Sequence, residues 1–143
     1  VRILLKYKTI GDLQMKYDVK TIKIKIESPG YTAVDITPYI KEIIDKNQLD
    51  KGIALVYSSE KNSIITEIEY EPELLSDLEV FLQNIGCIDK GLCDVVLGRS
   101  IVVPIINNHL FLGQFKNIVF IDLSRNAGEK SIVVALEGIF KNN

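Results

Sequence analysis

The sequence predicts an α+β domain, with a mostly antiparallel β-sandwich or sheet and two or three helices packed on one side. Three observations predict this class. Most apolar runs are short, as in strands, two stretches repeat apolar residues at helical spacing, and strands follow one another directly at both ends of the chain. A doubly wound parallel sheet would need more crossover helices, so we expect hairpin-like connections.

The composition is that of one folded domain. The chain has 143 residues, of which 47% are hydrophobic and 25% charged, enough to bury a core within a single domain over residues 1–143. The net charge of −2 argues against nucleic-acid binding, which requires a basic surface. The one lysine-dense segment, residues 16–25, alternates with isoleucine and is typical of a solvated strand face.

Neither a membrane segment nor a secretory signal is recognisable. No apolar run reaches the roughly 18 residues that cross a bilayer, and the first residues lack the charged, apolar and small-residue order of a signal peptide. We therefore expect a cytoplasmic protein. Cys87 and Cys93 have the spacing C-x5-C, which suits neither a zinc site nor a disulfide framework, so we expect free thiols, some of them buried.

The first half of the chain predicts strands around one helix. Residues 1–10 and 13–27 form two strands joined at Gly11-Asp12, the second with three isoleucines on one face. A helix follows, with Thr37 capping its exposed amides and Pro38 at its first position. Its buried face carries Ile40, Ile43 and Ile44. Residues 53–57 then form an apolar strand. Because all five residues are apolar, the pattern predicts a strand that is buried on both faces.

A second strand and a second helix follow a polar loop at residues 58–63. Residues 64–70 alternate, which places Ile65, Glu67 and Glu69 on one face. Pro72 opens the helix, Gly86 ends it, and five positions form its apolar stripe: Leu74, Leu75, Leu78, Leu82 and Ile85. Residues 87–97 fit either a loop or a short helix.

The most apolar segment predicts a hairpin. Two runs, residues 100–106 and 110–121, flank Asn107-Asn108, and asparagine tolerates the positive φ of a tight turn. A hairpin this apolar is expected in the core. Gly113 and Gln114 interrupt its second run, which indicates a bulge or the close approach of another backbone or a ligand. A turn at residues 126–128 and a last strand at 131–140 complete the chain.

Residues able to perform catalysis are few. His109 is the only histidine, lies beside the predicted turn, and fits an exposed residue better than a ligand or base; no G-x-S-x-G motif accompanies it. Glu67 and Glu69 point the same way on a strand and could form an acid/base pair or bind a cation, although a solvated face explains them more simply. Arg99-Ser100 could hold an anion, although a plain surface arginine is the simpler interpretation.

Residues 32–140 resemble the YjbQ family, which is often assigned as secondary thiamine-phosphate synthase. Five motifs carry the resemblance: Asp35-Ile36-Thr37, residues 52–57, residues 69–72, residues 98–105 (GRSIVVPI), and residues 110–118 (LFLGQFKNI) with Asp122. The resemblance implies a family core at residues 19–143 and an additional N-terminal strand or hairpin at residues 1–18. It also implies a homotrimer.

The sequence departs from the family where histidines are expected. Those positions fall at about Ser59 or Glu60 and near Gly91, and Phe115 and Lys116 replace a tryptophan and a glutamine. What carries over is mainly scaffold, namely Gly98, Ser100, Pro104, Gly113, and one acid, Glu67 or Glu69. Without imidazoles a zinc-like site loses its ligands, so we expect no metal and no cofactor.

Two functions follow from this comparison. The first is a protein that is not an enzyme, a small-ligand-binding or structural oligomeric domain with a reduced cleft between residues 58–62 and 87–98. The alternative is residual phosphoryl or alkyl transfer resembling thiamine-phosphate synthase, with Glu67 or Glu69 as acid/base and Arg99 holding a phosphorylated small ligand. The candidate ligand-binding residues are Ser59, Glu60, Asp94, Arg99, Ser100 and Gln114. A structural partner that pairs through residues 1–16 is a third possibility.

Overall fold

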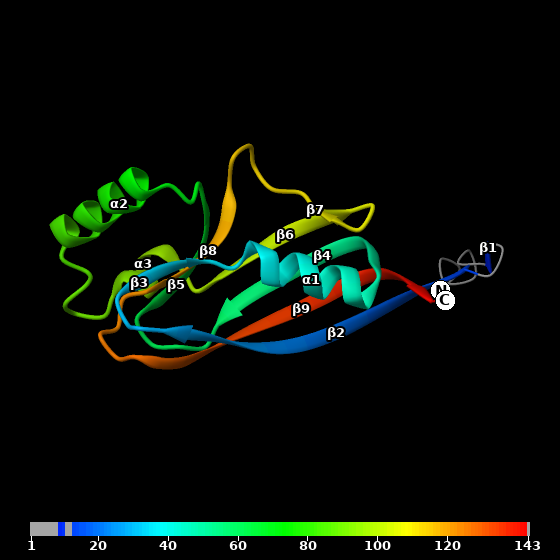
Figure 1. Cartoon of the computed structure of the whole chain (residues 1–143), viewed down its shortest axis with the longest axis horizontal. Coiled ribbons are helices and arrows are strands. Elements are labelled where there is room, and N and C mark those ends of the chain that lie inside the picture. Colours follow the sequence, from blue (N-terminus) through cyan, green and yellow to red (C-terminus); the bar gives the residue numbers. More distant parts are fainter. Residues whose placement is uncertain (1–8, 11–12, 143) are drawn as a thin grey trace.

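Two antiparallel sheets and three helices make up the described part of the chain (Figure 1). This computed structural model describes residues 9–10 and 13–142. The larger sheet contains, in spatial order, β1 (Thr9–Ile10), β2 (Leu13–Ser28), β9 (Gly128–Asn142), β4 (Leu49–Ser58), β6 (Ser100–Ile106) and β7 (His109–Leu110). The smaller sheet contains β3 (Thr32–Asp35), β8 (Asn117–Asp122) and β5 (Ser63–Ile68). The α+β class is confirmed.

The long ribbon of β2 and β9 forms one side of the molecule, and the two strands pair from Gln14 opposite Asn142 to Ser28 opposite Gly128. The predicted alternation in β2 is confirmed, because Ile22, Ile24 and Ile26 all contact the main core. The predicted first strand, at residues 1–10, lies mostly outside the described residues. Pairing through residues 1–16 therefore stays a prediction.

Helix α1 (Thr37–Asn47) begins where predicted, but Thr37 does not cap it. Ile36 is the N-cap, and the Thr37 amide donates to Asp35 Oδ1 at 3.0 Å. The Thr37 hydroxyl instead accepts from the Ile118 amide at 2.8 Å, and so satisfies a buried donor at the start of β8. The predicted apolar face is confirmed, since Ile40, Ile43 and Ile44 are buried.

The expectation that residues 53–57 are buried on both faces is wrong. Ala54 and Val56 are buried, whereas Ile53 and Tyr57 are 38% and 37% exposed. The larger sheet packs on α1 and the smaller sheet through one face only, so its strands alternate. In β5, by contrast, Ile64 and Ile65 are both buried, because the smaller sheet packs on both of its faces.

The predicted hairpin is correct only at its turn. Asn107 and Asn108 have φ of 52° and 66°, and β6 pairs with β7 across them. After Leu110 the chain leaves this sheet, and β8 joins β3 and β5 in the other. The hairpin is not wholly core, since Val102 and Ile106 are 58% and 47% exposed on the outer face of β6. The interruption at Gly113 and Gln114 therefore marks a crossing between sheets.

Helix α2 (Pro72–Ile85) has the predicted bounds, and Gly86 ends it with φ of 75°. Its apolar stripe is less buried than expected, because Leu82 alone among its residues is fully buried and Leu74 and Ile85 are exposed. Helix α3 (Cys93–Leu97) occupies the ambiguous segment. Both helices contact a second core on the outer face of the smaller sheet.

Candidate ligand cavity

A cavity of about 560 Å³ lies between the β4–β5 turn and the segment that connects α2 to β6. These are the two segments between which the sequence suggested a cleft. Eight residues line it: Lys61, Asn62, Asp89, Lys90, Gly91, Asp94, Val95 and Arg99.

The β4–β5 turn forms one wall and is held by buried serines. The Ser63 hydroxyl donates to Glu60 O at 2.8 Å and lies 2.6 Å from the Ser58 hydroxyl. Because the Ser63 proton is already used, Ser58 donates to Ser63. Asn62 adopts the left-handed conformation with φ of 55°, and its carbonyl accepts from Leu123 N at 2.8 Å. The turn therefore presents Lys61 and Asn62 from a fixed backbone.

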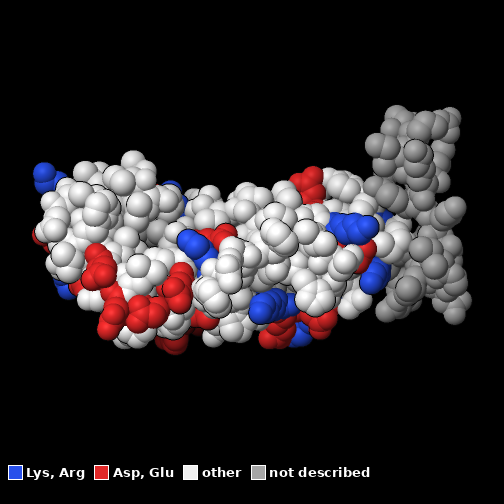
Figure 2. All heavy atoms as spheres, turned by 90° about the horizontal axis from the view of Figure 1, so that it is seen from above, with Lys and Arg blue, Asp and Glu red and all other residues white. Residues whose placement is uncertain are grey.

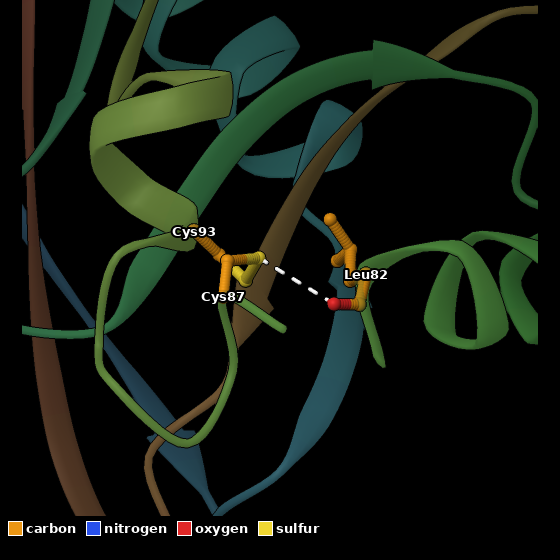
Figure 3. The surroundings of a disulfide bond; sticks show 3 residues. All are labelled: Leu82, Cys87 and Cys93. Carbon is orange, nitrogen blue, oxygen red and sulfur yellow. Dashed lines mark hydrogen bonds between the residues drawn. A yellow bond between two sulfur atoms is a disulfide. The ribbon is translucent and has the colours of Figure 1, made fainter. Parts of the chain in front are cut away.

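A disulfide between Cys87 and Cys93 organises the opposite wall (Figure 3). The expectation of free thiols is wrong, although both sulfur atoms are buried as expected. The chain reverses after α2, with Leu92 N donating to Cys87 O at 2.9 Å, and this reversal brings both cysteines into one apolar cluster. The closed loop carries Asp89, Lys90 and Gly91 to the cavity. In Figure 3 the Cys87 sulfur faces Leu82 O, at 3.7 Å.

Arg99 and Asp94 both line the cavity and form an ion pair there. Arg99 Nε lies 4.0 Å from Asp94 Oδ2, and the two side chains are 37% and 11% exposed. The Arg99 guanidinium also lies over the Tyr57 ring, 5.7 Å from its centroid. Arg99 O accepts from Ser58 N at 2.8 Å, which ties this residue to the opposite wall. Asp94 Oδ1 is buried without a hydrogen-bond partner.

The cavity has an excess of positive charge. Three cationic side chains, Lys61, Lys90 and Arg99, face two carboxylates, Asp89 and Asp94. Neither lysine takes part in an ion pair with the described residues. Arg99 has five N–H donors, and Nε lies 4.0 Å from Asp94 Oδ2 without a hydrogen bond, so donors of the guanidinium can bind an anion.

Of the eight residues proposed from the sequence, Asp94 and Arg99 line this cavity. Glu67 lies farther along β5, where its carboxylate accepts from Gly113 N at 2.7 Å. Glu60 Oε2 accepts from Ser131 N at 2.7 Å. The remaining four are exposed and do not line the cavity: Ser59, Glu69, Ser100 and Gln114.

Another group does approach Gly113 closely, but it is neither the backbone nor the ligand that the sequence suggested. The approaching group is the Glu67 side chain, because a Cβ at Gly113 would lie 3.0 Å from Glu67 Oε2. Glu67 therefore fastens the connection between β7 and β8, and this hydrogen bond gives it a structural role.

The sequence did not single out Lys61, Asn62, Asp89 or Lys90, and it named Gly91 only as the place near which a family histidine is expected. Each belongs to a short polar turn, and such turns are common on any surface. The available signal was the presence of lysines in both segments that the motif comparison placed on either side of a cleft.

The donors at the expected histidine positions do not fit a zinc-type site. Ser59 is exposed, Glu60 is bound to Ser131 N, and Gly91 has no side chain. Within residues 9–10 and 13–142, no three His, Cys, Asp or Glu side chains gather closely enough to hold a metal ion. His109 lies elsewhere, with Nδ1 2.6 Å from Asn107 O at the β6–β7 turn.

Comparison with known sequences identifies a family. The family model described as "UPF0047 protein YjbQ-like" matches residues 20–138. A UPF0047 protein from Methanothermobacter thermautotrophicus is 31% identical across 63% of this chain and 72% of its own length. Another, from Archaeoglobus fulgidus, is 27% identical across 72% of this chain and 90% of its own.

Solved structures share the fold. A protein of unknown function from Sulfolobus solfataricus P2, described as YbjQ-like, superposes with a TM-score of 0.80 at 22% identity, covering 86% of this chain and 99% of its own. A hypothetical protein from Aeropyrum pernix K1 gives 0.74 at 19% identity, covering 83% and 98%. At these identities the likeness concerns the fold alone.

Proposed function

Because the chain belongs to the YjbQ-like UPF0047 family, we propose that it is a ligand-binding member that holds a small phosphorylated molecule without a histidine-bound metal. The observation that carries this proposal is the cavity with an excess of positive charge, formed by Lys61, Lys90 and Arg99. Its two walls are each held by buried contacts, namely the serine pair and the disulfide.

Arg99 is the residue on which a phosphate would depend most. A guanidinium binds two phosphate oxygens with parallel hydrogen bonds, whereas lysines act as point charges. Asp94 and the Tyr57 ring restrict the orientation of the Arg99 side chain before any ligand arrives. Less side-chain entropy is then lost on binding.

The test is calorimetric titration with inorganic phosphate and with ethyl phosphate. We expect both to bind the wild type and Arg99→Gln to weaken each by about tenfold or more, because a hydrogen bond to a charged group contributes about 1.5 to 3 kcal/mol. Arg125→Gln is the matched control, because Arg125 stacks on Tyr31 and does not line this cavity. Unchanged affinity in Arg99→Gln would overturn the proposal. Stoichiometric zinc or nickel in the purified protein would contradict its metal-free part.

The alternative, residual transferase activity with Glu67 or Glu69 as acid/base, draws less support. Glu67 is occupied by the Gly113 amide, Glu69 is exposed beyond β5, and neither lines the cavity with Arg99. An acid/base group has to reach the proton that it transfers.

We also propose that the protein forms a homo-oligomer, a trimer as the family resemblance implies. The outer face of the larger sheet supports this, because three of its strands, β2, β4 and β6, expose large apolar side chains there: Tyr17, Val19, Ile53, Tyr57, Val102 and Ile106. No helix of the described chain is long and apolar enough to span a membrane. A cytoplasmic location stays a prediction, and the disulfide counts against a strongly reducing compartment.

A further inference from the structure

A second cavity, of about 190 Å³, lies beneath α2 against β3 and β8. It shares no lining residue with the cationic cavity. Six of its residues are aliphatic: Ala33, Leu75, Leu78, Leu82, Ile121 and Leu123. The others are Tyr31, Thr32, Ser76, Glu79 and Asp122.

The volume and the lining suit a single aromatic ring. A cavity of about 150 Å³ lined by aliphatic and aromatic side chains is large enough to take up benzene. The space beneath α2 is somewhat larger and mostly aliphatic. Leu75 and Leu78 are only half-buried, so a ring entering between them would bury apolar surface that now meets water.

The charge at this cavity is negative and comes from Glu79. Two carboxylates, Glu79 and Asp122, line the space, and no lysine or arginine does. Asp122 is already compensated, because Lys130 Nζ lies 3.8 Å from Oδ2 and Ser28 donates to the same oxygen at 2.7 Å. Glu79 Oε2 accepts one hydrogen bond, from the Tyr31 hydroxyl at 2.7 Å. A carboxylate can accept about four, so Glu79 can still bind a donor.

The surroundings of α2 favour a cation over an anion. The helix carries Glu73, Asp77 and Glu79 and no basic residue. Figure 2 shows acidic side chains gathered at the left end of the molecule, the end that carries α2 in Figure 1. Arg125 lies over the Tyr31 ring, 4.4 Å from its centroid, but it lines a neighbouring hollow and not this cavity.

We propose that the cavity beneath α2 is a second binding site, for a small molecule that joins one aromatic ring to an ammonium group. The ring packs among the leucines and Ile121, and the ammonium group donates to Glu79. Tyr31, in the β2–β3 turn, fixes the Glu79 carboxylate at this cavity, because its hydroxyl donates to Oε2 at 2.7 Å. This site is independent of the proposed phosphate cavity.

Three probes separate the ring from the charge. Benzylamine has both, toluene has the ring alone, and methylammonium has the charge alone. We expect benzylamine to shift the methyl NMR signals of Leu78, Leu82 and Ile121 saturably, toluene to do so more weakly, and methylammonium to leave them unchanged.

Two variants test the roles of charge and volume. Glu79→Gln keeps an acceptor for Tyr31 but removes the charge, so benzylamine affinity should fall about fivefold to tenfold while toluene affinity is unchanged. Asp77→Asn is the matched control, because it removes one charge from the same helix without lining the cavity. Ala33→Leu should fill the space and abolish binding of both aromatic probes.

Several results would overturn the proposal. One is that neither aromatic probe shifts these signals, as would happen if side chains of a second copy already fill the cavity. Others are equal losses in Glu79→Gln and Asp77→Asn, or benzylamine shifts that map to the cationic cavity. Phosphate binding would be unaffected by any of these outcomes, so failure here and failure of the proposed function are distinguishable.

Discussion

Tyr31 joins three separate segments around α2. Its backbone adopts φ of 49°, an uncommon value for a non-glycine residue, and its amide donates to Ser124 O at 2.7 Å. Its hydroxyl donates to Glu79 on α2, and its ring lies under Arg125. One side chain thus connects the β2–β3 turn, the helix and the β8–β9 connection.

The hydrogen bond to Glu79, aided by burial, raises the pKa of Tyr31 above its usual value of 10.0. A raised pKa means that folding favours the protonated phenol. The contribution to stability is therefore complete below about pH 10 and declines as the pH rises toward the folded-state pKa. We expect Tyr31→Phe to lower the free energy of unfolding by about 1 kcal/mol at neutral pH, and to reduce the loss of stability above pH 10.

Urea unfolding from pH 7 to 11 measures this effect. Tyr39→Phe is the control, because Tyr39 is exposed on α1. Identical pH profiles for the wild type and Tyr31→Phe would show that the Tyr31–Glu79 contact contributes nothing to folding.

The connection between α2 and α3 is the element that most directly links stability to the cationic cavity. The disulfide closes a loop with a sequence separation of 6 residues. In the chain-entropy account, cross-linking so short a loop stabilises a protein by about 2 kcal/mol. The same loop carries Asp89, Lys90 and Gly91. The position of Lys90 in the cavity therefore depends on the conformation of this loop.

We expect the double variant Cys87→Ser, Cys93→Ser to lose about 2 kcal/mol of unfolding free energy and to bind phosphate more weakly than the wild type. Treating the wild type with a dithiol reductant should reproduce both effects. The variant itself should not respond to reductant, which provides the control. If the reduced wild type keeps its stability and its phosphate affinity, the disulfide has no part in shaping the cavity.

The elements that the sequence predicted well are those defined by local rules. Helix α2 has the predicted ends because Pro72 and Gly86 determine the local backbone conformation at those ends. Strand β2 alternates because one of its faces packs on the core and the other is exposed to solvent. The run at residues 110–121 was misassigned because apolar alternation does not specify which strand is the partner. Its two parts pair with different sheets.

The sequence predicted where the cationic cavity lies, but it predicted only two of the residues that line it. Family motifs located the two walls, and Arg99 and Asp94 were recognised by their charge. Lys61 and Lys90 were missed because each lies in an ordinary turn, and only the register of β4 with β6 and the reversal at Cys87 bring them together. The disulfide was missed because the proximity of two cysteines depends on that same reversal.

At the scale of the whole molecule, the outer face of the larger sheet exposes apolar side chains from β2, β4 and β6. Strand register places Val102 beside Leu55, Leu55 beside Ala135, and Ala135 beside Thr21, so one row crosses four strands. The next row brings Ile53 beside Pro104. In that row Glu137 lies between Ile53 and Val19, so a charged residue interrupts the apolar side chains. Exposed apolar patches rimmed by polar residues are typical of protein–protein interaction sites.

We expect Val102→Asp to dissociate the proposed oligomer, because it places a charge among the exposed apolar side chains of β4 and β6 on this face, and a desolvated unpaired carboxylate is strongly unfavourable. Val102 is 58% exposed in the single chain, so the isolated subunit should keep its fold, which circular dichroism would check. Val95→Asp on α3 is the matched control, because it introduces the same charge at an exposed valine on a different surface. Sedimentation equilibrium should give a multiple of 16.1 kDa for the wild type and the control, and the monomer mass for Val102→Asp. A monomeric wild type, or an unchanged mass in Val102→Asp, would remove this face from consideration as the interface.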